Sequence, residues 1–294
     1  MVLLIAGVVV GLLFNSTRGI LDAQKRSAVR TQLNALDAAL VNFVALNKRL
    51  PCPANGTIAS GAANAGVERP APCNAAAQTD GVLPWVTLGL SEGDASDPWN
   101  GRITYRVQPA LAAAPLLMDM SQCDPSATGA VGAGGACQLA AAPCTGSSAC
   151  TAPSRFLADK GLDVWDGQNG TAGWNARVNN AGAGSGAAYV LISHGPTGGG
   201  AFNASGQLQS GQLQNGTTSK YEITNLNGRP VAPPATMASA YQDAPLNDNA
   251  ALLPTPAPPA TPPPPEYDLH FDDYLSHPSI MTVLVKANLG PRAH

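Results

Sequence analysis

A serine next to a histidine is the first feature of this sequence that could carry out chemistry. Ser193 and His194 end a short apolar run, and a serine hydroxyl activated by an imidazole base is a common hydrolytic nucleophile. Neighbouring residues of a strand point to opposite faces, however, so these two side chains cannot act on one another. Ser193 is also not the serine of a G-x-S-x-G motif. We therefore expect no catalytic site and no enzymatic activity.

Two further segments carry side chains that bind metal ions. Residues 163–170 supply oxygen ligands suited to calcium, but they lack the spacing and the closing glutamate of an EF-hand, so we expect a solvated turn. His270, Asp272, Asp273 and His277 cluster near the end of the chain. An exposed element explains this cluster at least as well as a metal site does. We therefore assign no metal ligand and no cofactor.

The cysteines are the third chemical feature of the sequence. There are six of them, Cys52, Cys73, Cys123, Cys137, Cys144 and Cys150. They form no C-x-x-C pair and lie among Gly, Pro and Ala rather than at the spacings of zinc sites. We expect all six to be in disulfides, which places the body of the chain in an oxidising compartment.

The spacing of the cysteines suggests how they pair. A Gly/Ala/Asn-rich loop leaves at Cys52 and returns at Cys73, so we expect a bridge between these two. Closing a loop of about 20 residues contributes on the order of 3 kcal/mol to stability in the loop-entropy model. The other four cysteines allow three pairings among themselves. Sequential pairing, Cys123 with Cys137 and Cys144 with Cys150, is our preferred arrangement.

Composition limits both the amount of regular structure and the choice of partners. The chain has 294 residues, of which 12% are charged, 31 are glycine and 26 are proline. This composition predicts one head domain with long loops. The net charge is -3, and no stripe of Lys and Arg is interleaved with aromatic residues. The sequence therefore gives no electrostatic reason to expect nucleic-acid binding.

The chain starts with an uncharged apolar segment, Met1–Phe14. As a helix it would be about 21 Å long. The hydrocarbon core of a bilayer is about 30 Å thick and requires roughly 20 apolar residues, so this segment is too short to cross it. It could be the core of a signal peptide, a buried helix, or a membrane helix that lacks its first turns. A signal peptide needs a basic start and a small-residue cleavage site, and neither is present. We therefore favour the membrane helix.

An amphipathic pattern continues this segment from Arg18 without a break. Its apolar positions recur at helical spacing and predict a face that packs on the head, namely Val29, Leu33, Leu36, Leu40 and Phe43 or Val44. Pro51 cannot continue a helix. We expect one nearly continuous helix over residues 1–50, in which 1–14 form a membrane or filament core and 18–50 are amphipathic.

Residues 51–294 are expected to form the globular head. Asp97–Asn100 supply turn residues, and Ile103, Tyr105 and Val107 alternate with polar residues as in a half-buried strand. A second strand is predicted over residues 188–193, and a helix or strand over residues 271–285. Residues 254–265 are rich in proline and should form an extended surface loop. The predicted fold is α+β, with a long N-terminal helix packed on an antiparallel sheet that has disulfide-stapled loops.

Several of these segments together resemble one protein family. The chain resembles type IV pilin-like and type II secretion pseudopilin-like proteins in five segments. These are the runs MVLLIAGVVVGLL and LNKRLPCPANG, then an LPW-x-x-LGL segment, a DPW turn and a strand that ends in Ser-His-Gly. In that family a basic leader precedes an apolar helix with a glutamate near its start. Neither feature is present here, and we expect about seven residues of the mature helix to lie upstream of Met1, which would give the length that a bilayer requires.

The resemblance implies a structural subunit that waits in the bacterial inner membrane and is then assembled into an extracellular filament or a periplasmic pseudopilus. Its partners would be other copies of itself, other pilins and the assembly machinery. The residues expected to pack in the filament core are Val2, Leu3, Leu4, Ile5, Val8, Val9, Leu12 and Leu13. Three alternatives remain open at this point: a minor pilin or tip adhesin, an exported enzyme with a membrane anchor, and another exported domain held by a single-pass anchor.

Overall fold

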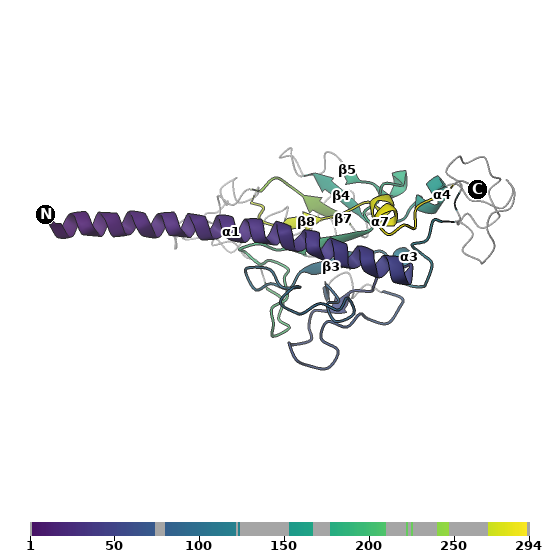
Figure 1. Ribbon diagram of the computed structural model, residues 1–294, viewed down its shortest axis with the longest axis horizontal. Helices are drawn as coiled ribbons and strands as arrows, with labels where there is room; N and C mark the ends of the chain where they lie inside the picture. Colours follow the sequence, from purple (N-terminus) through teal and green to yellow (C-terminus); the bar gives the residue numbers. More distant parts are fainter. Residues whose placement is uncertain are drawn as a thin grey trace, which may run out of the picture.

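The computed structural model describes most of the helix and the head. The described residues are 2–73, 80–121, 123, 153–166, 177–209, 222, 225, 240–246 and 270–292, with side chains from Ile20 onward. The fold is α+β, as predicted, and consists of a long N-terminal helix and two sheets (Figure 1). The predicted proline-rich loop, residues 254–265, lies outside the described residues.

The N-terminal helix α1 spans Val2–Asn47 without interruption. It ends where Lys48 adopts a left-handed conformation with φ of 54°, a common way to terminate a helix. Leu50, which precedes Pro51, is buried, so the chain turns directly into the head after the helix. The helix therefore ends slightly earlier than the predicted boundary at Pro51, because the left-handed residue stops it before the proline does.

One face of α1 is packed against the head by an apolar stripe. Val29, Leu33, Leu36 and Leu40 are all buried, and Val44 extends the stripe by a further turn. Of the two alternatives for the last position, Val44 is the buried one. Phe43 is only partly buried, and its ring lies 5.3 Å from the guanidinium of Arg49. The choice of Phe43 for the packed face is therefore wrong.

The main sheet has five antiparallel strands in the order β1-β2-β3-β6-β8. Their bounds are Ala54–Asn55 for β1, Gly81–Val82 for β2, Thr104–Val107 for β3, Tyr189–Ser193 for β6 and Tyr274–Ser276 for β8. The strands predicted near residues 103–107 and 188–193 are thus β3 and β6, which are hydrogen-bonded neighbours. The longest strands lie at the centre of the sheet, where pairing is available on both sides.

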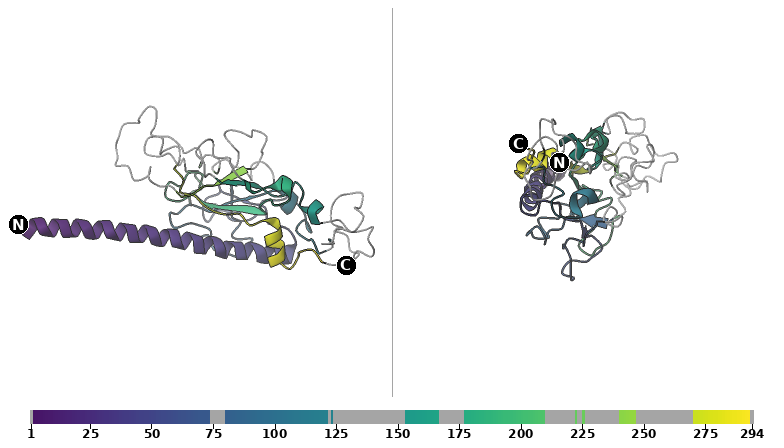
Figure 2. Two further views of the ribbon diagram at one scale, coloured as in Figure 1. Left: turned by 90° about the horizontal axis from the view of Figure 1, so that it is seen from above. Right: turned by 90° about the vertical axis from the view of Figure 1, so that its right-hand side faces the viewer.

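A second sheet covers the face of the main sheet that lies opposite α1 (Figure 2). It has the order β5-β4-β7, with β4 at Asp163–Asp166, β5 at Arg177–Asn179 and β7 at Ala240–Asp243. Strands β4 and β7 pair in parallel, which the long connection between them permits. The expectation of a purely antiparallel head therefore holds for the main sheet alone.

This second layer changes the environment of the central strands. Tyr189 and Leu191 of β6 belong to the core beneath α1, whereas Val190 and Ile192 pack with Val164 on the opposite side. All four residues of β3 are buried as well. The prediction of a half-buried β3 with a polar outer face is therefore wrong, because the second sheet buries the side on which Thr104 and Arg106 lie.

Short helices complete the structure. They are α3 at Pro109–Ala112, α4 at Pro153–Leu157, the 3-10 helix η1 at Ala181–Ala183 and α7 at Ile280–Lys286. Helix α7 starts at Ser279, whose hydroxyl accepts a hydrogen bond from the backbone N–H of Thr282, as N-cap residues commonly do. The segment predicted as helix or strand near residues 271–285 contains both, since β8 precedes α7.

The loop after α1 is fastened to the head by a disulfide and an ion pair. Cys52 and Cys73 form the predicted bridge across a separation of 21 residues. Arg49 binds Glu68 through two hydrogen bonds of 2.8 Å, and Glu68 also accepts the backbone N–H of Cys52. These bonds connect the end of the helix to an irregular loop that contributes little apolar surface.

The aspartate of the DPW segment organises the turn that leads into β3. Asp97 Oδ1 accepts hydrogen bonds from the backbone N–H groups of Trp99 and Gly101. The ring of Trp99 stacks on Tyr274 of β8 at a centroid distance of 6.0 Å, and Lys25 of α1 lies 5.8 Å from the centre of the Trp99 ring. The predicted turn is therefore present, and it also connects the helix with the sheet.

A carboxylate on the packed side of α1 provides a polar link to the sheet. Asp37 Oδ1 accepts a hydrogen bond of 2.9 Å from the Tyr189 hydroxyl, and Oδ2 accepts one of 2.6 Å from Ser276. One side chain thus ties the helix to both β6 and β8. Burial raises the pKa of Asp37 above its usual value, although these two hydrogen bonds act in the opposite direction.

The apolar stripe generates a test with a matched control. Leu40→Ala should lower the free energy of unfolding by about 2–5 kcal/mol, because Leu40 is fully buried and its truncation leaves a cavity. Leu46 lies on the same helix but is 84% exposed, so Leu46→Ala should change stability by no more than about 0.5 kcal/mol. Chemical denaturation followed by tryptophan fluorescence measures both. Equal effects would show that α1 does not pack on the head through this face.

The Asp37 link predicts a pH-dependent contribution to stability. The pKa of Asp37 is raised in the folded protein, so the native state favours the protonated carboxyl. The contribution of this preference to the free energy of unfolding is fully present below the unfolded pKa. It is lost as the pH rises through the folded pKa. Asp37→Asn should remove that loss. The stability of the variant relative to the unmutated chain should therefore increase from pH 3 to pH 7 in denaturation experiments. A difference that stays constant or declines would contradict the raised pKa.

Candidate functional site

The N-terminal part of α1 projects beyond the head (Figures 1 and 2). The buried stripe starts at Val29, so residues 2–28 precede it and span about 40 Å at 1.5 Å per residue. All eight positions expected in the filament core lie in this part, and their side chains fall outside the described residues. Where side chains are described, Ile20 and Leu21 are 57% and 58% exposed. This end of the helix therefore presents apolar side chains that the head does not cover.

No helix combines the length and the hydropathy needed to cross a membrane within the part of the chain whose side chains are described.

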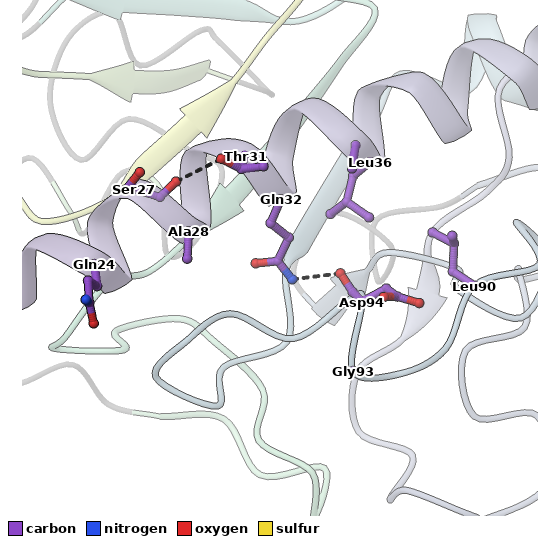
Figure 3. Close-up of a pocket in the computed structure, with 10 residues that line it drawn as sticks. Gln24, Ser27, Ala28, Thr31, Gln32, Leu36, Leu90, Gly93 and Asp94 are labelled. Atoms are coloured by element: carbon purple, nitrogen blue, oxygen red, sulfur yellow. Dashed lines mark hydrogen bonds between the residues drawn. The ribbon is translucent and has the colours of Figure 1, made fainter. Parts of the chain in front are cut away.

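A groove of about 730 Å³ runs along α1 where the helix meets the loop at residues 90–94 (Figure 3). Ser27, Ala28, Thr31 and Leu36 contribute to its helix wall, and Leu90 faces them from the loop. Ser27, Ala28 and Thr31 are small, so a neighbouring element could approach the helix closely here. The groove lies close to the projecting part of the helix.

The Gln32 side chain fastens the loop beside this groove to the helix. The Gln32 amide donates a hydrogen bond of 2.7 Å to the backbone carbonyl of Asp94 (Figure 3) and one of 2.8 Å to that of Ser96. Ser91 in turn donates a hydrogen bond of 2.7 Å to the carboxylate of Asp94. The groove therefore has one wall of regular helix and one wall of internally bonded loop.

Ser193 and His194 are both buried and make separate hydrogen bonds. The Ser193 hydroxyl donates to Asp97 Oδ2 at 2.7 Å, whereas His194 Nε2 lies 2.9 Å from the Thr104 hydroxyl. His194 Nδ1 lies 3.4 Å from Asp273 Oδ1. The two neighbours thus engage different partners, as the alternation of side chains along β6 requires.

A cluster of buried carboxylates and histidines lies next to this strand end. His270 Nε2 lies 3.3 Å from Glu222 Oε1 and 3.6 Å from Asp272 Oδ2, and each of the three side chains is at most 3% exposed. Asp272 and Asp273 were expected on an exposed element together with His270 and His277. That expectation is wrong for His270, Asp272 and Asp273, because the second sheet and the loop after β6 cover the start of β8.

Loop residues hold the carboxylates of this cluster in place. Thr197 donates to both oxygens of Asp272, from its backbone N–H and from its hydroxyl, each at 2.9 Å. The backbone N–H of Asp272 donates to Glu222 Oε1 at 3.1 Å. Gly195 has a φ of 55°, and a side chain there would overlap the Asp272 backbone. The glycine after His194 therefore allows the loop to close around Asp272.

The charges of the cluster strongly perturb its acids. Burial, together with the neighbouring carboxylates of Asp273 and Asp272, raises the pKa of Glu222 to about 10. Burial also raises the pKa of Asp273, while His194 lowers it. Asp273 Oδ2 further accepts a hydrogen bond of 2.7 Å from Asn225. Such a concentration of buried titratable groups is typical of functional sites and of structural networks alike.

The other two sequence candidates have separate environments. His277 Nδ1 lies 2.7 Å from Asn179 Oδ1 and its Nε2 lies 3.1 Å from Asp243 Oδ2, so it takes no part in the cluster around His270. Asp163–Asp166 form strand β4, so the prediction of a solvated turn is wrong for them. Residues 167–170 lie outside the described part of the chain.

The described cysteines are all oxidised. Besides the bridge from Cys52 to Cys73, Cys123 is also in a disulfide. Cys137, Cys144 and Cys150 lie outside the described residues, so the preferred sequential pairing stays a prediction.

Sequence reasoning missed Glu222 entirely. Glu222 and Asp272 are 50 residues apart in the chain, and no local pattern connects them. The one available signal was the run His270-Phe271-Asp272-Asp273, which places a histidine and a carboxylate on the same side of an extended segment. Comparisons with family models, with curated proteins and with solved structures found no match to the chain.

Proposed function

We propose that this protein is a structural subunit of a filament of the type IV pilin-like class, which polymerises through α1. The observation that carries the proposal is the division of α1: one unbroken helix of 46 residues packs on the head over its C-terminal part and projects beyond the head over the rest (Figure 1). The resemblance of the N-terminal, LPW and DPW segments to that family supports the same function.

The unbroken helix suits a filament subunit better than a simple anchor. A tether between an anchor and a head needs no rigid connection, and a flexible linker would serve it. Here the apolar sequence Met1–Phe14 continues into a helix whose later turns are fixed to the sheet by buried leucines and by Asp37. Any force or position imposed on the apolar end is therefore transmitted to the head.

In the proposed assembly, the apolar ends of neighbouring helices pack together in the core of the filament while the heads form its outside. Before assembly the same end would lie in the inner membrane. Moving between these places exchanges contacts with lipid for contacts with other helices, which small residues such as Gly7 and Gly11 favour by permitting close approach. The groove beside Ser27 and Ala28 offers a surface for a neighbouring subunit.

The proposal predicts that a charge in the apolar end abolishes filaments. Val8→Asp in the full chain should do so, because a carboxylate at the centre of a membrane helix costs about 2.5–3.5 kcal/mol on insertion scales and would be unpaired in a helix bundle. Electron microscopy of cells that produce the variant, with antibody labelling of the head, is the measurement.

The matched control places the same substitution on the head. Val86 is 51% exposed, so Val86→Asp should leave both folding and filaments intact. Immunoblotting confirms that both variants accumulate. Labelled filaments of normal length from the Val8→Asp chain would mean that the N-terminal segment is an anchor only, and the filament proposal would fall.

A further inference from the structure

The buried cluster at the start of β8 brings one histidine close to two carboxylates. His270 Nε2 lies 3.3 Å from Glu222 Oε1 and 3.6 Å from Asp272 Oδ2. Charge-assisted hydrogen bonds between nitrogen and oxygen measure about 2.7–2.9 Å. The three ligand atoms nevertheless all lie within 4.8 Å of one another. They are therefore close enough to bind one ion together.

These distances fit a shared metal ion. In a tetrahedral site with metal-ligand bonds of about 2.0–2.2 Å, neighbouring ligand atoms are about 3.4 Å apart. The second carboxylate oxygen of Glu222 could also contact the ion, because Oε2 is buried and has no hydrogen-bond partner among the described residues. A buried carboxylate oxygen without a donor is costly unless a cation satisfies it.

The balance of charges points in the same direction. In the described part of the chain, the ion pairs of Glu222, Asp272 and Asp273 are all made with two histidines, His270 and His194. Three carboxyl groups thus share two imidazole rings. A dication bound by Glu222, Asp272 and neutral His270 would be neutralised by its two carboxylates.

We propose that Glu222, His270 and Asp272 together bind one first-row transition-metal dication, for which Zn²⁺ is the probe. The ligand set selects this class because imidazole suits zinc and related metals, whereas calcium takes six to eight oxygens. Thr197 supports the site by donating to both oxygens of Asp272, since donors to a ligating carboxylate hold it in position in metal sites.

The site would have a structural role in the head. Glu222 lies in the connection between β6 and β7, Asp272 precedes β8, and Thr197 belongs to the loop after β6. One ion would join these three segments at the edge of the core. Because the ligands are buried, we expect the metal to be incorporated as the head folds and to exchange slowly afterwards.

The first test measures the metal in the unmutated protein. The full chain, folded in detergent with equimolar Zn²⁺ and passed through gel filtration, should retain one zinc per chain by elemental analysis. X-ray absorption should show one imidazole nitrogen and oxygen ligands at about 2.0–2.2 Å. Co²⁺ in place of zinc should give the visible absorption of a tetrahedral ion, and calcium at the same concentration should not displace zinc. A chain that retains no zinc would overturn the proposal.

The second test assigns the ligands. Glu222→Gln preserves the shape of the side chain but removes its charge, so it should weaken zinc binding by at least about tenfold. His277→Gln is the matched control, because His277 lies in the same C-terminal segment and bonds to Asn179 and Asp243 instead; it should bind zinc like the unmutated chain. Equal zinc affinity in Glu222→Gln and the unmutated chain would place the metal elsewhere and overturn the assignment. The measurements involve no filaments, so they can fail or succeed independently of the proposed function.

Discussion

The apolar stripe of α1 against the main sheet is the interaction on which the rest of the structure depends. Val29, Leu33, Leu36 and Leu40 bury the face of the sheet that contains Tyr105 and Tyr189. Strands β3, β6 and β8 come from distant parts of the chain, and this contact gives them a common surface to cover. Apolar burial alone would not fix the position of α1 along the sheet. Asp37 fixes it, because its carboxylate accepts hydrogen bonds from both Tyr189 and Ser276.

The same packing divides α1 into two parts. Its later turns are fixed to the sheet by buried apolar side chains. Its first turns lie beyond the head, where they can contact other molecules (Figure 2). In the proposed filament, the junction between the two parts determines how far each head stands from the core. A rigid helix makes that distance the same for every subunit.

Strand β6 marks the point where the apolar core changes into a polar one. Its residues up to Ile192 pack into cores on both faces, and the following Ser193 and His194 are buried with polar partners. The carboxylates at the start of β8 extend this polar region. Burying charged carboxylates costs free energy. The proposed dication would offset this cost for the carboxylates of the head.

Local patterns in the sequence were enough to predict α1, its packed face, strands β3 and β6, the Asp97 turn and the bridge between Cys52 and Cys73. Helical periodicity, turn residues and loop closure act over short distances, so they can be read without a structure. The burial of Thr104 and Arg106 could not be predicted, because it depends on a second sheet built from residues 163–166, 177–179 and 240–243. The meeting of Glu222 with His270 was likewise decided by tertiary structure, since only the folding of several loops over one strand end brings these two side chains together.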